Sequence, residues 1–130
     1  MANAMYSLAK EQFLGGDLDW DAGIFRAVMV DTGIYTFSAA HTSYDDLAGA
    51  VVFTESAALG TKTKVGGVAD AADITFTAAT GTTVEALVVF YDSGTSSTDT
   101  LICYIDVSPT ITPNGTNIDV TWNASGIFAI

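Results

Sequence analysis

Short runs of alternating apolar and polar residues, each closed by a turn signal, recur through most of the chain. A period of two is typical of β-strands that bury one face. The runs predict strands at 25–30, 34–37, 51–53, 74–77, 84–91, 99–107, 118–122 and 127–130. Turn residues separate many of these runs at spacings of about ten residues, as in antiparallel sandwiches and barrels. The sequence therefore predicts a mainly β fold, a single antiparallel β-sandwich or barrel domain over residues 1–130.

The predicted strand at 99–107 has a regular alternation that assigns its side chains to two faces. Leu101, Cys103 and Ile105 are expected on one face. Ile102, Tyr104 and Asp106 are expected on the other, because successive side chains in a strand point to opposite sides.

Residues 4–14 carry the chain's helical pattern. Asn3 precedes them as a candidate N-cap, and Gly15-Gly16 follows where a helix-ending glycine belongs. A helix this short is unstable alone. We therefore expect residues 1–16 to form a short N-terminal helix or arm that packs on its own domain or on a neighbouring subunit.

The middle of the chain leaves two questions open. Residues 41–50 predict either a loop or a single helical turn capped by Ser43. In residues 61–65, Lys62 and Lys64 alternate with threonine and valine. That pattern is typical of an exposed edge strand protected by lysines, or of an ordered arm.

Charge excludes several classes of partner. The chain has 4 basic and 15 acidic residues, a net charge of −11. Phosphate and anionic membrane surfaces repel such a chain, so neither nucleic acid nor membrane is expected as a partner. The longest apolar run is far shorter than a membrane-spanning helix, and the first ten residues lack the features of a signal peptide. We expect a soluble protein.

Catalytic and metal-binding residues are scarce. One cysteine and one histidine cannot form a disulfide or a Cys/His zinc site within the chain. Cys103 sits in a core-like run and His41 in a predicted loop, so neither predicts a nucleophile–base pair. Asp17, Asp19 and Asp21 resemble the start of an EF-hand. The sixth and twelfth loop positions, however, hold alanine and valine instead of glycine and glutamate. No enzyme, metal or cofactor is expected.

What remains is surface for binding other proteins. Aromatic residues are enriched at such interfaces. The candidate interface residues are Tyr6, Phe13, Trp20, Tyr35, Tyr44, Lys62 and Lys64.

Both ends of the chain resemble small tailed-bacteriophage structural proteins. At the N-terminal end, residues 6–20 lead through Trp20 into a strand at 25–31. At the C-terminal end, the strands at 86–92 and 99–106 precede an Asn-Gly turn and a closing pattern over 114–127. The resemblance implies a virion structural protein without catalytic residues, most specifically a capsid decoration (cement) protein. Such a protein binds and stabilises the major capsid shell.

The resemblance carries further expectations. The partners would be the major capsid protein or other virion proteins, and the chain would form a homo-oligomer, a dimer or trimer. It would be made in the host cytoplasm and reside on the capsid surface. The alternatives are a head–tail connector or tail structural subunit, a carbohydrate- or calcium-binding β module, and last a small hydrolase using His41. The β module rests on the three aspartates with Trp20 and Trp122.

Overall fold

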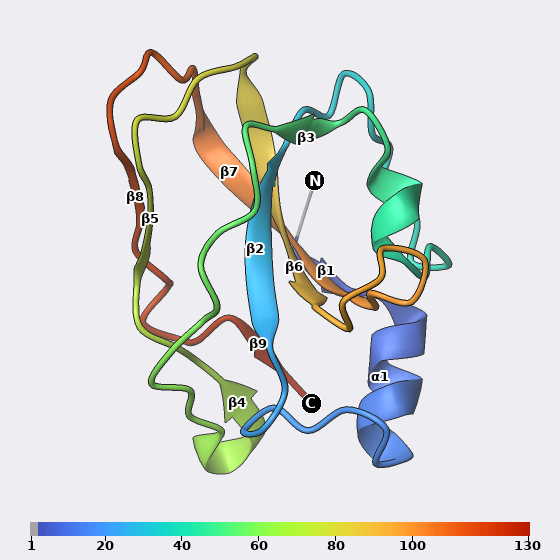
Figure 1. Cartoon of the computed structure of the whole chain (residues 1–130). Coiled ribbons are helices and arrows are strands. Elements are labelled where there is room, and N and C mark those ends of the chain that lie inside the picture. Colours follow the sequence, from blue (N-terminus) through green and yellow to red (C-terminus); the bar gives the residue numbers. More distant parts are fainter. Residues whose placement is uncertain (1–2) are drawn as a thin grey trace.

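A five-stranded antiparallel sheet forms the centre of the computed structural model, which describes residues 3–130 (Figure 1). Its strand order is β1-β7-β6-β2-β3. The bounds are Ala4–Met5 for β1, Leu101–Ile111 for β7, Val84–Tyr91 for β6, Phe25–Val30 for β2 and Val51–Val52 for β3. The predicted mainly β fold with one short helix near the N-terminus is confirmed.

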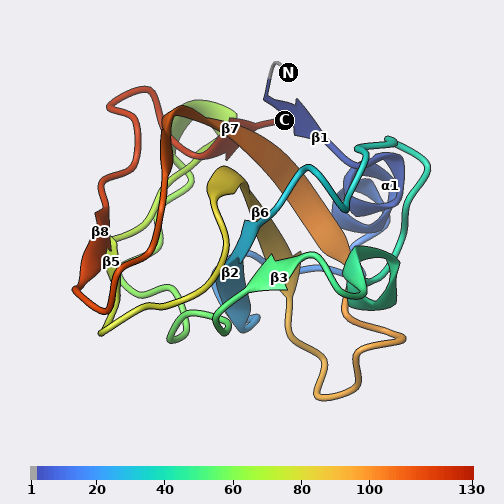
Figure 2. The same cartoon turned by 90° about the horizontal axis from the view of Figure 1, so that it is seen from above.

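Two small antiparallel pairs accompany the main sheet. Strand β4 (Val68–Ala69) pairs with β9 (Phe128–Ala129), and β5 (Ile74–Phe76) pairs with β8 (Ile118–Val120). These pairs lie along one side of the main sheet, so the whole is sandwich-like (Figures 1 and 2). Within residues 3–130, no helix is long and apolar enough to cross a membrane.

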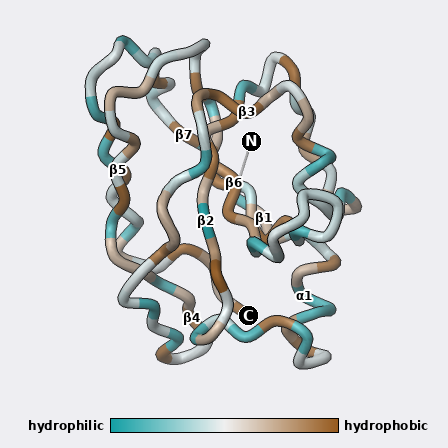
Figure 3. The backbone as a smooth tube through the Cα atoms, viewed as in Figure 1, coloured by the Kyte–Doolittle hydropathy of each residue, from teal (hydrophilic) through white to brown (hydrophobic). Residues whose placement is uncertain are grey.

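Both faces of the main sheet are buried, which explains why β6 reads as a continuous apolar run. One face packs against the two small sheets through Phe76, Ile118 and Trp122. The other is covered by the segment between β2 and β3, through Tyr35 and Leu47. Figure 3 shows hydrophobic residues concentrated along the central strands.

A β-bulge in β7 changes the predicted side-chain pattern. Val89 pairs with Cys103, but the next residue, Phe90, pairs with Leu101, so Ile102 is the extra residue. As a result, Ile102 and Cys103 both belong to the core cluster that contains Trp122, while Leu101 joins Tyr104 on the other face. The expectation that Leu101 and Cys103 share a face is therefore wrong, because a bulge breaks the period of two.

The N-terminal helix is shorter than predicted. Helix α1 spans Ser7–Leu14, after strand β1, and its N-cap residue is Tyr6. Asn3 instead accepts the backbone N–H of Asp106 through its side-chain oxygen at 2.8 Å. The helix packs on β7 and buries Ala9 completely. It ends at Gly15, as the glycine pair predicts.

Three predictions for the middle of the chain are resolved by the structure. Residues 34–37 are not a strand but part of the covering segment. Residues 44–47 form a 3-10 helix, η1 (Tyr44–Leu47), after Ser43, which selects the predicted helical turn over a loop. Residues 61–65 form a loop with one isolated bridge, between Thr63 and Asp70, and lead into a second 3-10 helix, η2 (Val65–Gly67).

Candidate docking site

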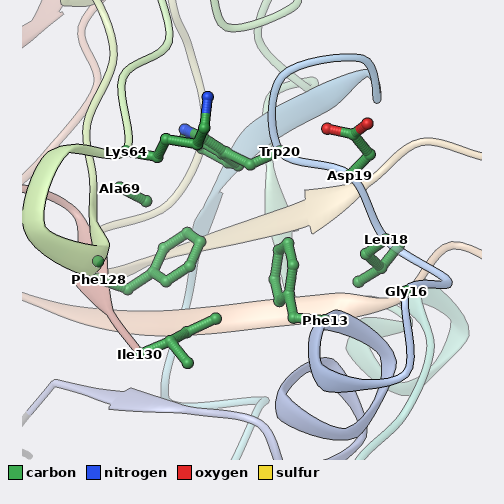
Figure 4. A pocket seen from close by; sticks show the side chains of 10 residues that line it. Phe13, Gly16, Leu18, Asp19, Trp20, Lys64, Ala69, Phe128 and Ile130 are labelled. Carbon is green, nitrogen blue, oxygen red and sulfur yellow. The ribbon is translucent and has the colours of Figure 1, made fainter.

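An apolar hollow of about 430 Å³ opens where the end of α1, η2, β4 and β9 meet (Figure 4). Segments from both ends of the chain build it. Its lining residues are Phe13, Gly16, Leu18, Asp19, Trp20, Lys64, Gly67, Ala69, Phe128 and Ile130. Most of the lining side chains are apolar, and Asp19 and Lys64 lie toward one side of the opening.

The turn after α1 builds one wall. Gly16 adopts a φ of 79°, a left-handed conformation that glycine takes without strain. The backbone N–H groups of Asp17 and Leu18 then donate to the Gln12 carbonyl at 2.9 and 3.2 Å. This turn folds the chain back under the helix and brings Leu18 beside Phe13.

The C-terminal strand builds the opposite wall. The backbone N–H of Ile127 donates to the Ala69 carbonyl at 2.7 Å, and that of Ile130 donates to the Gly67 carbonyl at 3.0 Å. Gly126 lets this strand approach β4, because a Cβ there would collide with the Val68 side chain. Phe128 and Ile130 are thereby held against the hollow.

Aromatic contacts fix the floor of the hollow. The ring centroids of Phe13 and Phe128 are 5.7 Å apart, and Trp20 meets Phe128 edge-on at 5.2 Å. The Trp20 indole N–H donates to the Thr63 carbonyl at 2.9 Å, which sets the orientation of the ring. Such packed aromatic surfaces lose little conformational entropy on binding and suit an interface centre.

One strongly exposed apolar side chain lines the hollow, and two others follow lining residues in the sequence. Val65, Leu14 and Ile130 are 83%, 80% and 61% exposed, the three highest values among large apolar residues in the described chain. Of these, Ile130 lines the hollow, whereas Leu14 follows the lining residue Phe13 and Val65 follows Lys64. An exposed apolar side chain in the wall of an apolar cavity is typical of an interaction site.

Charged groups border the same region. The Lys64 ammonium pairs with the Asp21 carboxylate, and that hydrogen bond raises the pKa of Lys64. The Lys62 ammonium lies 5.8 Å from the centre of the Trp20 ring and 5.3 Å from that of Phe25, and it donates to the Gly23 carbonyl. Asp19 accepts the backbone N–H groups of Asp21 and Ala22. Both lysines are therefore already engaged within the chain.

Four of the seven predicted interface residues lie at or beside the hollow: Phe13, Trp20, Lys62 and Lys64. The other three lie on the opposite side of the main sheet. Tyr6 is fully buried, so its side chain offers no surface to a partner, and Tyr35 is nearly so. Tyr44 is half-buried against the Phe90 ring, 4.8 Å away.

Residues that sequence reasoning missed complete the site. Phe128 and Ile130 are not among the predicted interface residues, although they form one wall of the hollow. Their local pattern is that of an ordinary short strand, which gives no signal of an interface.

The groups considered for catalysis occupy structural positions. Cys103 is buried, and this burial raises the pKa of its thiol to about 12. His41 contacts the Tyr35 hydroxyl through Nδ1 at 2.7 Å, and that hydroxyl lies 2.9 Å from the Tyr6 hydroxyl. These contacts place His41 at the end of a hydrogen-bonded chain that leads into the core.

The residues behind the carbohydrate and calcium alternative are also engaged elsewhere. Trp20 and Trp122 are 6% and 8% exposed, and a sugar platform needs an open ring face. The Trp122 indole N–H donates to the Ala72 carbonyl at 3.0 Å. In residues 3–130, no group of three His, Cys, Asp or Glu side chains is placed to hold a metal ion.

No protein-family model matches the chain, and no curated protein is similar enough to count as a match.

Proposed function

We propose that this chain is a non-enzymatic virion structural protein, most specifically a capsid decoration protein that binds and stabilises the major capsid shell. One observation carries the proposal: an aromatic-floored apolar hollow with the exposed side chain of Ile130 in its wall. The resemblance of both chain ends to small phage structural proteins supports it.

The architecture suits attachment to a lattice. The main sheet is covered on both faces, so a single copy has a closed core before it meets a partner. Burial of the apolar lining of the hollow against a partner would then contribute binding free energy, at about 25 cal/mol per Å² of apolar surface removed from water. The acidic remainder of the surface would keep decorated particles apart in solution.

The chain's place in the particle follows from this role. It would lie on the outer capsid surface, bound to the major capsid protein, as a dimer or trimer that repeats with the shell symmetry. A connector or tail subunit would use the same kind of apolar contact within a ring, so the number of copies separates the two.

The decisive experiment is the copy number per purified particle, measured by quantitative mass spectrometry against the major capsid protein. Decoration predicts hundreds of copies, in a simple ratio to the shell subunits. A dozen copies or fewer would assign the chain to the connector or tail. Absence from the particle would reject the virion role.

A second measurement connects the role to the hollow. Shells lacking the protein are mixed with the wild-type chain or with the Ile130→Ser variant and sedimented. The Ile130 side chain lines the hollow and is 61% exposed, so the variant should fold normally and bind weakly. Ile34→Ser is the matched control, because Ile34 is 60% exposed and does not line the hollow. Equal binding by all three proteins would remove the hollow from the contact.

A further inference from the structure

We propose that the hollow receives one large apolar side chain from a partner segment that carries lysine or arginine next to it. This inference rests on the proposed function only for the identity of the partner. The chemistry of the segment is read from the hollow and its surroundings.

The first requirement, an apolar anchor, comes from shape. The hollow's volume of about 430 Å³ falls in the range of ordinary ligand sites, so a bulky side chain can enter it. Phe13, Trp20 and Phe128 hold one another in place through ring contacts, so the site is preformed. An anchor in a preformed apolar pocket is the usual centre of binding energy at an interface.

The exposed part of the wall extends the apolar contact beyond the anchor. Ile130, which lines the hollow and is 61% exposed, would cover the base of the inserted side chain. It would help to exclude water from the anchor, as the surroundings of a binding hot spot do.

The second requirement, a neighbouring cation, comes from charge. Asp19 lines the hollow, and Asp17 and Asp21 flank it in the sequence. Lys64 also lines the hollow, where it pairs with Asp21, and Lys62 lies over the Trp20 and Phe25 rings. The three aspartates exceed the two lysines by one negative charge, on a protein of net charge −11, and a cation beside the anchor would complement that excess.

Charge also argues against a second copy as the occupant. A twofold contact places the same patch against itself, so two patches with the same excess negative charge would meet. Each copy would also bring eleven excess negative charges. A basic segment gives a complementary potential instead, which raises both association rate and specificity.

Three short capped peptides test both requirements by NMR titration of the full-length protein, with the Trp20 indole N–H as reporter. The first contains Lys-Leu-Lys, the second Glu-Leu-Glu and the third Lys-Ala-Lys. We expect the first to shift the Trp20 signal and to bind at least tenfold more tightly than either other peptide. Because exposed charges are screened, its advantage over the acidic peptide should shrink at about 0.5 M salt.

Matched variants of the protein test the charged contact and the apolar contact separately. Asp19→Asn keeps the side-chain oxygen that accepts the turn N–H groups but removes the charge, and should weaken the Lys-Leu-Lys peptide about threefold. Asp45→Asn, the same change on η1, should leave it unchanged. Ile130→Ser, at a lining residue that is 61% exposed, should weaken the peptide, and Ile34→Ser, at a residue outside the hollow that is 60% exposed, should not.

Several results would overturn the inference. If the acidic peptide bound with equal affinity, a neighbouring cation would not be required. If the alanine peptide bound with equal affinity, a large apolar anchor would not be required. Failure of the first peptide to shift Trp20 at millimolar concentration would remove the site. Self-association that shifts Trp20 without peptide would assign the hollow to a second copy.

The outcome is separable from the proposed function. Selective peptide binding by a protein that is absent from particles would uphold the basic apolar partner and reject the virion role. Hundreds of copies per particle with no peptide selectivity would do the reverse.

Discussion

The hydroxyl of Tyr6 is buried and lies 2.9 Å from the hydroxyl of Tyr35, which in turn lies 2.7 Å from Nδ1 of His41. A buried hydroxyl that loses its partner keeps its full desolvation cost. The two tyrosines therefore differ in what their removal leaves behind. Tyr35 still has His41 when Tyr6 is changed, whereas Tyr6 loses its partner when Tyr35 is changed.

We expect Tyr6→Phe to lower the free energy of unfolding by about 1 kcal/mol, the value of a typical buried hydrogen bond. Tyr35→Phe should cost more, about 2 kcal/mol, because it orphans the Tyr6 hydroxyl and removes the His41 contact. The double variant should cost less than the sum, since the two changes share one interaction. Urea denaturation measures all three, and a larger loss for Tyr6→Phe would contradict this reading.

Residue type alone separates core from surface poorly in this chain. Phe13 and Trp20 line the hollow, although Trp20 is itself a core residue, while Tyr6 and Tyr35, with the same interface prediction, lie in the core beneath the covering segment. All four are aromatic residues in apolar surroundings. The difference arises from the covering segment over residues 31–50, whose position depends on contacts distant in the sequence.

At the scale of elements, regular strands were predictable and irregular ones were not. The bounds of β2 and β6 agree with the apolar pattern, because both strands run uninterrupted through the centre of the sheet. Residues 34–37 alternate like a strand, yet Phe37 packs on the rings of Tyr6 and Tyr104 without pairing in the sheet. The bulge in β7 depends on its partner strand β6, which no local pattern reveals.

Helix α1 lets its attachment be tested with one substitution. Ala9 is fully buried against the core, whereas the next residue, Lys10, is exposed. Ala9→Asp buries an unpaired charge and should lower the free energy of unfolding by about 3 kcal/mol or more. Lys10→Asp should change it by no more than about 0.5 kcal/mol beyond the small effect of helix propensity.

Thermal denaturation followed by circular dichroism compares the two variants. A detachable arm would leave the melting temperature of the β domain unchanged in Ala9→Asp, and that result would contradict the packing of α1 as part of the core. A melting temperature lowered only in Ala9→Asp would assign the helix to the cooperative unit.

For the whole molecule, three of the four basic side chains, those of Arg26, Lys62 and Lys64, are held close to acids or carbonyls. Arg26 contacts Asp92 at 2.7 Å and Glu55 at 4.0 Å, and Lys64 pairs with Asp21. These contacts leave the excess negative charge spread over the rest of the surface. Each side chain that loses a proton to become an anion adds to the repulsion among these negative charges, and this repulsion destabilises the folded state.

Buried acidic groups make the direction of the pH dependence predictable. Burial raises the pKa of Tyr6, Tyr35, Tyr44 and Tyr104, and raises that of Cys103 to about 12. The carboxylates of Asp106 and Glu85 add to the rise at Tyr104. Each group is therefore held neutral by the fold, while in the unfolded chain the thiol ionises near pH 9 and the phenols near pH 10.

Stability from these groups is fully present below about pH 9 and is lost as the pH rises, because the unfolded chain then releases protons that the folded chain retains. Above its pKa in the unfolded chain, each fully buried group lowers the free energy of unfolding by up to about 1.4 kcal/mol per pH unit. We expect urea midpoints to hold between pH 7 and 9 and to fall steeply by pH 11. Tyrosinate absorbance should rise together with the loss of the native circular dichroism signal. If most of the tyrosines ionised at pH 10 to 11 while that signal stayed native, the burial argument would be wrong.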